Sequence, residues 1–460
     1  MPHGRYSKIE CAGLSKDGDS LIDYSIMEIP RERKIFLDWC ANADPGPLTE
    51  DERKLYGQFL QHFIEKAEAG DAGCQYDLGV KFAEGIFVPY DIATAIHWFE
   101  QAVDGGDLDA MTTLASLYWL GEGGVEQDFH RAFELMEKAA ESGSAVAQYE
   151  LARMHWDGLG TNKDLTCAFR WFHAAACNND EKKRYLKSYH NRIGPADSLL
   201  KVAVFRDDDI KAAAQYQVAE ALANGCGVER DLLLAKDWYE AAASRGHGLA
   251  QCELGMCLAQ GIGGRDIVSA VSWWETAARN GVGQAALNAA VAYSRGDGVS
   301  KDIGKANEWA RVAADAGVLA GLVLLGNFEL ENAENVAALQ RAKKWYIQAA
   351  KAGDVDGQYS VGLACHRLGA MTLNEGLLQR INERLKTGHT VSTTEEASLE
   401  AAVFAHHKEA LLWFYLAEEN GSEAAPEMVS FLEEHLGAEV VHSVKQYEPE
   451  FRRKFAACEF

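Results

Sequence analysis

The side chains that could perform chemistry are scattered along the 460 residues rather than gathered into a catalytic motif. The motifs HExxH, GxSxG and GxxxxGKS/T, typical of zinc proteases, serine hydrolases and phosphate-binding loops, do not occur. His406 and His407 are adjacent and diverge on a helix, and four more histidines lie in other helical patterns. We interpret all six as packed or surface residues, and we expect no catalytic residue, metal site or cofactor. The other four are His97, His155, His173 and His366.

The glycine-rich segments and the cysteines also give weak chemical signals. Segments such as "GCGVERD" contain G-x-G, but they join two predicted helices, whereas a phosphate-binding loop joins a strand to a helix. The segment "RGDGVSKD" lacks the alternating oxygen ligands and the final glutamate of a calcium-binding EF-hand. The ten cysteines include no C-x-x-C pair and no zinc spacing, so we expect reduced thiols.

Composition narrows the class of protein further. With 45 basic and 69 acidic residues, the formal charge is −24, which disfavours nucleic-acid binding because the protein repels phosphates. Scarce proline, at 8 residues, favours helices. The amino terminus lacks the apolar stretch of a secretory signal, and no run of apolar residues is long enough to span a membrane. We therefore expect a cytoplasmic protein without membrane insertion.

Four residue positions recur together in eight copies, usually 35 to 37 residues apart. A tryptophan slot, filled once by Leu135, has alanine three residues before it and alanine four residues after it. Eight residues after the slot stands glycine, with Asn179 as the one substitute. These offsets predict a helix that packs an indole between two methyl groups and ends at a left-handed glycine. The slot tryptophans are Trp98, Trp171, Trp238, Trp273, Trp309, Trp345 and Trp413.

A second helix precedes each of these helices, with an apolar stripe such as Ala110, Leu114 and Tyr118. The glycine loop between the two helices ends in an aspartate, which is expected to accept bonds from the free N–H groups of the second helix. The ring that follows the slot is assigned to the core. The aspartates are Asp91, Asp128, Asp164, Asp231, Asp266 and Asp302, and the rings are Phe99, Phe172, Tyr239, Trp274, Tyr346 and Phe414.

The whole repeat resembles the Sel1-like repeat (SLR). Its pattern is A-x-x-x-L-(G/A)-x-x-(Y/F), then G-x-G-V and D, then A-x-x-W-x-x-x-A-A-x-x-x-G. This family is related to the tetratricopeptide repeat, and the resemblance covers residues 72–421. It implies an all-α, right-handed α-solenoid of about eight helix-turn-helix repeats with helical caps and two inserts. It also implies a non-catalytic scaffold or adaptor that binds another protein, such as a secreted effector or toxin, or an envelope or secretion component.

Two long intervals between slots indicate inserts. The first contains the basic residues Lys182, Lys183 and Arg184; it is either a solvated helix or decayed repeat, or a docking surface for an acidic element. The second is either a packed cap or a mobile flap. The expected divisions are 1–48 (non-repeat), 49–71 (capping helix), 72–179 (repeats one to three), 180–208 (basic insert), 209–353 (repeats four to seven), 354–421 (repeat eight with insert 369–399) and 422–460 (closing helices).

The partner is expected on the concave face, which the first helices of the repeats should line. Counted from the first stripe alanine, offsets +6 and +9 should point inward. Trp119, Arg153 and Trp156 occupy such positions in neighbouring repeats, and tryptophan and arginine are common binding hot spots. Glu220 and His366 are weaker candidates. The alternative is that both indoles pack against the next repeat.

Three functions follow from these expectations. The first is a protein-binding scaffold, and a close variant is an immunity or inhibitor protein that clasps a toxin or effector enzyme. The inserts favour this variant slightly, because an unadorned scaffold needs none. The third is a hydrolase with its active site in an insert, for which no motif gives support.

Overall fold

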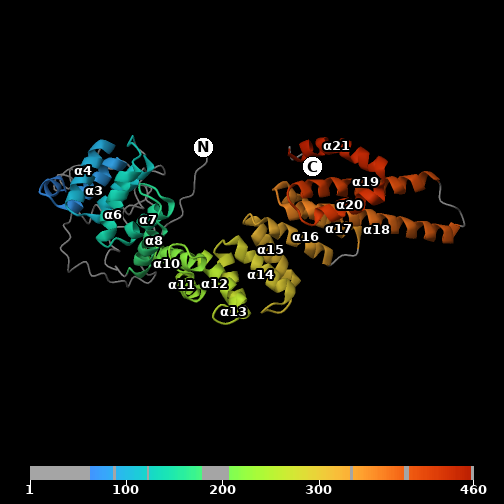
Figure 1. The fold of residues 1–460 in the computed structure, drawn as a ribbon, viewed down its shortest axis with the longest axis horizontal. Coiled ribbons are helices and arrows are strands. Elements are labelled where there is room, and N and C mark those ends of the chain that lie inside the picture. The colour runs from blue at the N-terminus through green and yellow to red at the C-terminus, as the bar shows by residue number, and fades with distance from the viewer. Residues whose placement is uncertain are drawn as a thin grey trace, which may run out of the picture. The chain divides into compact units, whose positions relative to one another are not determined.

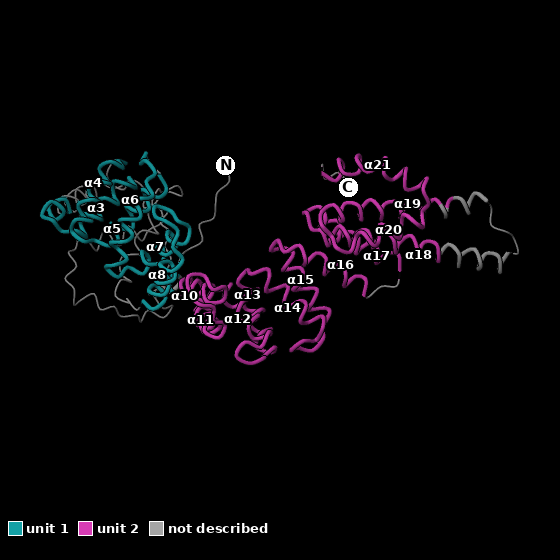
Figure 2. The backbone as a smooth tube through the Cα atoms, in the orientation of Figure 1, with its two compact units in different colours: residues 1–211 teal, residues 212–460 magenta. Residues whose placement is uncertain are grey.

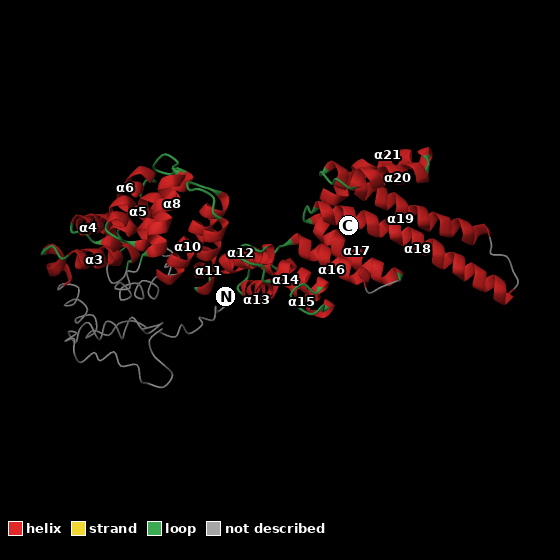
Figure 3. Cartoon of the chain, turned by 60° about the horizontal axis from the view of Figure 1, so that its bottom comes forward, coloured by secondary structure: helices red, strands yellow, loops and turns green. Residues whose placement is uncertain are grey.

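The computed structural model describes residues 63–85, 90–121, 124–178, 207–331, 335–387 and 393–456. The calls for residues 1–48, for most of the capping helix and for Lys182, Lys183 and Arg184 lie outside these ranges. Within them the chain forms helices joined by short loops and turns, with no strand (Figure 3). The described helices include none that is both long and apolar enough to cross a membrane. The all-α solenoid expected from the sequence is confirmed.

The chain divides into two compact units, residues 1–211 and 212–460 (Figure 2). Unit 1 contains three helical hairpins, in which each helix packs most closely on its neighbours in sequence. The helix pairs are α3 (Ala72–Glu84) with α4 (Ile92–Asp104), α5 (Leu108–Leu120) with α6 (Phe129–Glu141), and α7 (Ala145–Asp157) with α8 (Leu165–Cys177).

Unit 2 begins within α10 (Asp207–Asn224) and continues the same alternation of helices (Figure 1). The described part of the expected insert, 369–387 and 393–399, lies in two long helices, α18 and α19, which pack against each other. The remaining helices are α11 (Leu232–Ser244), α12 (Gly248–Gln260), α13 (Ile267–Arg279), α14 (Gly283–Arg295), α15 (Ile303–Asp315), α16 (Leu319–Glu331), α17 (Val336–Lys351), α18 (Val355–Thr387), α19 (Thr393–Glu419), α20 (Ala425–Leu436) and α21 (Ala438–Ala456).

The second helix of each hairpin begins and ends as the sequence predicts. Asp231 accepts bonds from the backbone N–H groups of Leu233 and Leu234, both at 3.0 Å, and so satisfies donors that the first helical turn leaves unpaired. The five other loop aspartates cap their helices in the same way. After the helix, Gly246 has a φ of 91°, a left-handed conformation that glycine adopts without a Cβ clash.

The core of each hairpin centres on the residue after the tryptophan slot. Phe99 and Phe414 are fully buried, as predicted for this position. The prediction that the slot indoles are buried is wrong for all but Trp413, because the other six are half-buried. Helical spacing does not decide between the two rings, because the alanine stripe lies midway between the slot and the residue after it. The packing of neighbouring helices decides which ring is buried.

Candidate protein-binding surface

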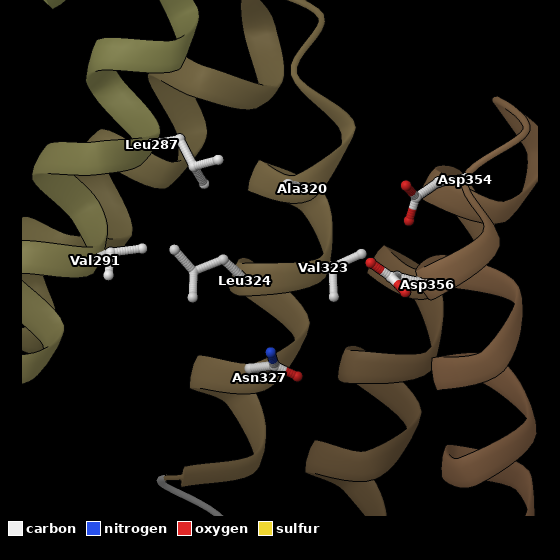
Figure 4. A pocket seen from close by; sticks show the side chains of 8 residues that line it. All are labelled: Leu287, Val291, Ala320, Val323, Leu324, Asn327, Asp354 and Asp356. Atoms are coloured by element: carbon white, nitrogen blue, oxygen red, sulfur yellow. The ribbon is translucent and has the colours of Figure 1, made fainter. Parts of the chain in front are cut away.

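The first helices of three successive hairpins in unit 2 form a groove that is open to solvent. The groove lies between α14, α16 and the start of α18 (Figure 4). Leu287 and Val291 come from α14, and Val291 faces Leu324 of α16 (Figure 4). The lining is therefore apolar at its centre. Its residues are Leu287, Val291, Ala320, Val323, Leu324, Asn327, Asp354 and Asp356.

Helical register explains why these side chains meet. Counted from Ala285 in α14 and Gly321 in α16, Val291 and Asn327 both stand at offset +6, the position that the sequence rule expects to face inward. Asn327 is held in place because its side-chain oxygen accepts a 2.7 Å bond from the hydroxyl of Tyr346, the core ring of the same hairpin. Two residues of the groove therefore stand at an offset that the sequence rule names.

Two carboxylates bound the α18 side of the groove, and both point towards Val323 in Figure 4. Asp354 caps α18 and accepts a bond from the backbone N–H of Gly357 at 2.6 Å. Burial raises the pKa of Asp354. The hydrogen bond from Gly357 lowers this pKa in part, and the charge of Asp356 raises it further. Neither carboxylate pairs with a basic side chain within the part of the chain that the structure describes.

The predicted patch of Trp119, Arg153 and Trp156 lies in unit 1. Both indoles are half-buried. Each contacts a ring of its own hairpin: the ring centroids of Trp119 and Phe129 lie 5.1 Å apart, and those of Trp156 and Phe172 lie 6.5 Å apart. Arg153 is exposed and forms a 3.0 Å ion pair with Glu150. The patch stays a predicted site, with part of each indole available to a partner.

Glu220, a weaker candidate, belongs to unit 2 and stands at offset +6 of α10. Its carboxylate accepts a 2.6 Å bond from the hydroxyl of Tyr239, as Asn327 does from Tyr346. A polar side chain at this offset therefore holds the core tyrosine of its own hairpin. Glu220 has a structural partner and keeps surface that faces the solvent.

His366, the last candidate, lies beside His407, which the sequence does not place near it. Their ring centroids are 5.1 Å apart, and His366 also meets Phe431 of α20 edge-on at 5.8 Å. Burial lowers the pKa of His366, with a further effect from His435. Burial also lowers the pKa of His407, with a smaller effect from His366. Among the described residues, no three His, Cys, Asp or Glu side chains could together hold a metal ion.

The pair of His366 and His407 should make the carboxy-terminal helices sensitive to acid. Because their pKa values are lowered in the fold, both histidines take up protons at a lower pH there than in the unfolded chain, where their pKa is about 6.5. The free energy of unfolding is therefore unaffected above that pH and falls below it, until the folded histidines protonate. Replacing both by leucine should reduce the fall in the thermal midpoint between about pH 7.5 and 5.5. The exposed control His97→Leu should leave that fall unchanged; an equal fall in all three proteins would contradict the prediction.

Sequence reasoning missed most of the groove because it considered only tryptophan, arginine, glutamate and histidine at two offsets. Leu287 and Val323 stand at offset +2, where α7 and α10 carry tyrosines. Asp354 is the N-cap of α18, three residues before Gly357, a position that the sequence rule did not consider. The usable signal was the absence of an aromatic residue at +2 in three successive repeats, which carry Cys252, Leu287 and Val323 there.

A model of the Sel1 repeat matches seven segments of the chain, at 72–107, 108–144, 145–180, 212–247, 248–282, 283–318 and 331–354. The hairpin of α18 and α19, expected as an eighth repeat, lies beyond the last of them. No protein of curated function matches the sequence.

Several solved structures are similar. A Sel1 repeat protein from Oxalobacter formigenes is 22% identical, with 82% of this chain and 90% of that chain covered and a TM-score of 0.52. A protective antigen of uropathogenic Escherichia coli with an SLR fold is 21% identical, with 92% of each chain covered and a TM-score of 0.42. An immunity protein from Pseudomonas aeruginosa is 16% identical, with 59% and 84% covered and a TM-score of 0.27. The first similarity indicates a shared fold, and the lower TM-scores of the others do not extend that conclusion.

Proposed function

The chain belongs to the Sel1 repeat family, and from this premise we propose that it is a non-catalytic scaffold that binds a partner protein in the groove of unit 2. Sel1 repeats generally mediate interactions between proteins. The observation that carries the proposal is the groove, which holds half-buried aliphatic side chains of Leu287, Val291, Val323 and Leu324 at a solvent-open face. Covering these side chains with apolar groups of a partner would remove them from water, which favours association.

The composition of the lining supports binding rather than catalysis. The groove contains aliphatic side chains, one amide and two carboxylates, and no serine, cysteine, histidine or lysine that could act as a nucleophile. The two carboxylates come from one turn, and Asp354 is committed to the cap of α18. An inhibitor of a toxin or of an effector enzyme would be a special case of this function, which uses the same surface and differs only in the partner.

The proposal predicts that a charge in the groove abolishes partner binding. We expect Leu324→Asp or Val291→Asp to lose the proteins that copurify with the tagged wild-type chain from its native cells, as identified by mass spectrometry. A desolvated carboxylate without a partner is costly at an apolar interface. Val268→Asp is a matched control, because Val268 is 66% exposed on α13, a second helix of its hairpin.

Circular dichroism should show that all three variants keep the helical content of the wild type. Leu324 also packs on the core of unit 2, so a lower unfolding midpoint is expected for Leu324→Asp than for Val268→Asp. Recovery of the same partners with Leu324→Asp as with Val268→Asp would rule out the groove as the binding site.

A further inference from the structure

The charges around the groove have one sign. The first helices of the hairpins in unit 2 are α10, α12, α14, α16 and α18. Their residues at offsets +2, +3 and +6 include Glu220 and Glu253 and no lysine or arginine. Burial raises the pKa of Glu253, with a contribution from Glu220, so these carboxylates lie close enough to interact. On the other side of the apolar centre stand Asp354 and Asp356. The apolar surface therefore lies between acidic groups on the α12 side and on the α18 side.

We propose that the occupant of the groove is a partner segment in which aliphatic or aromatic residues are followed by a lysine or arginine that pairs with Asp354 and Asp356. This inference rests on the proposed function and adds the chemistry of the partner. The apolar residues of the segment cover Leu287, Val291 and Leu324, and its cation meets the two carboxylates beside Val323.

Charge complementarity supports this occupant over an acidic or neutral segment. An acidic side chain placed next to Val323 would face Asp354 and Asp356, and like charges at an interface disfavour binding. A cation there forms charge-assisted hydrogen bonds, which are stronger than neutral ones. The net charge of −24 also attracts a basic segment at long range and speeds its encounter with the groove.

The experiment selects binders from a phage-displayed library of random peptides of about 12 residues, enough for an extended chain to cross three helices. Selected peptides are synthesised, and their affinities are measured for the full chain and for three variants by fluorescence anisotropy. The variants are Asp354→Asn with Asp356→Asn, the charge-matched control Asp237→Asn with Asp297→Asn, and Leu324→Asp. Asparagine can also cap α18, so the first variant keeps the helix start. Asp237 and Asp297 are exposed and lie outside the groove lining.

We expect the selected peptides to combine apolar residues with lysine or arginine, and to bind the Asp354 and Asp356 variant about tenfold more weakly than the control. Selected peptides without basic residues, equal binding to the two asparagine variants, or no enrichment at all would overturn the inference. The Leu324→Asp variant separates the two claims: if it loses peptides that the asparagine variants keep, the groove binds a partner but its charge preference is wrong. Peptides that bind Leu324→Asp as well as wild type would count against the groove itself.

Discussion

Replacing Trp413 by alanine should reduce the stability of the carboxy-terminal helices by about 3–5 kcal/mol, the usual cost of removing a fully buried large aromatic side chain. Trp413 is 1% exposed and is the largest of the fully buried side chains. Its indole meets Phe451 and Phe455 of α21 edge-on, at 5.2 and 5.4 Å. The substitution therefore leaves a cavity and also removes the surface on which α21 packs.

Chemical denaturation and hydrogen exchange would measure this effect. We expect the amides of α21 to lose protection first, because a stack of repeats is stabilised mainly by contacts between neighbours. Trp238→Ala is the matched control: it removes the same side chain from the same position of another hairpin, where the indole is half-buried. A smaller loss is expected there. Equal losses for the two variants would show that burial does not distinguish the two tryptophans.

Replacing Gly79 by alanine should destabilise unit 1 by about 1–3 kcal/mol through overpacking. A Cβ atom at this position of α3 would lie 2.6 Å from Cε1 of the Phe99 ring and 3.1 Å from the carbonyl oxygen of Ala95. The ring is fully buried, and the carbonyl belongs to the backbone of α4, so the two helices must move apart. Alanine occupies the equivalent position in α7 and α10. We therefore expect a less stable fold, not an unfolded chain.

Gly73→Ala in the same helix is the control for helix propensity. Gly73 is exposed, and an added Cβ would meet nothing closer than Oδ1 of Asp71 at 3.5 Å. Alanine should raise stability there by about 0.5–1 kcal/mol, because glycine loses more backbone freedom on folding. Thermal and urea unfolding of both variants would test the difference in sign. If both substitutions raised the stability, the ring of Phe99 would move aside for the added Cβ atom without loss of stability, and the prediction for Gly79 would be wrong.

The elements of the fold could be predicted because their signals are local. Asp231 and Gly246 bound one helix through hydrogen bonds and backbone angles that involve only a few neighbouring residues. The spacing of Ala235 and Ala242 identifies the helix face that packs, and this face lies between Trp238 and Tyr239. The depth of the slot indole could not be predicted in the same way. It depends on how far one helix is rotated against the next, and glycine or alanine on the facing helix sets how closely they approach.

The candidate groove could be predicted only in part. The offset that selects Val291 and Asn327 is a property of one helix, so the sequence supplies it. The acidic side of the groove combines Asp354, the N-cap of α18, with Val323 of the preceding first helix, and their proximity depends on how one hairpin packs on the next. His366 and His407 come together because α18 and α19 pair as one hairpin, in which they occupy the positions that Trp119 and Phe129 hold in the hairpin of α5 and α6.

The sequence by itself determined that this chain is a stack of Sel1 hairpins, because each hairpin is specified by contacts between residues close in the chain and repeated many times. Only the tertiary structure shows where the candidate groove lies. A groove forms where side chains of three successive hairpins leave space between them, and that space depends on the relative placement of helices that no single repeat encodes.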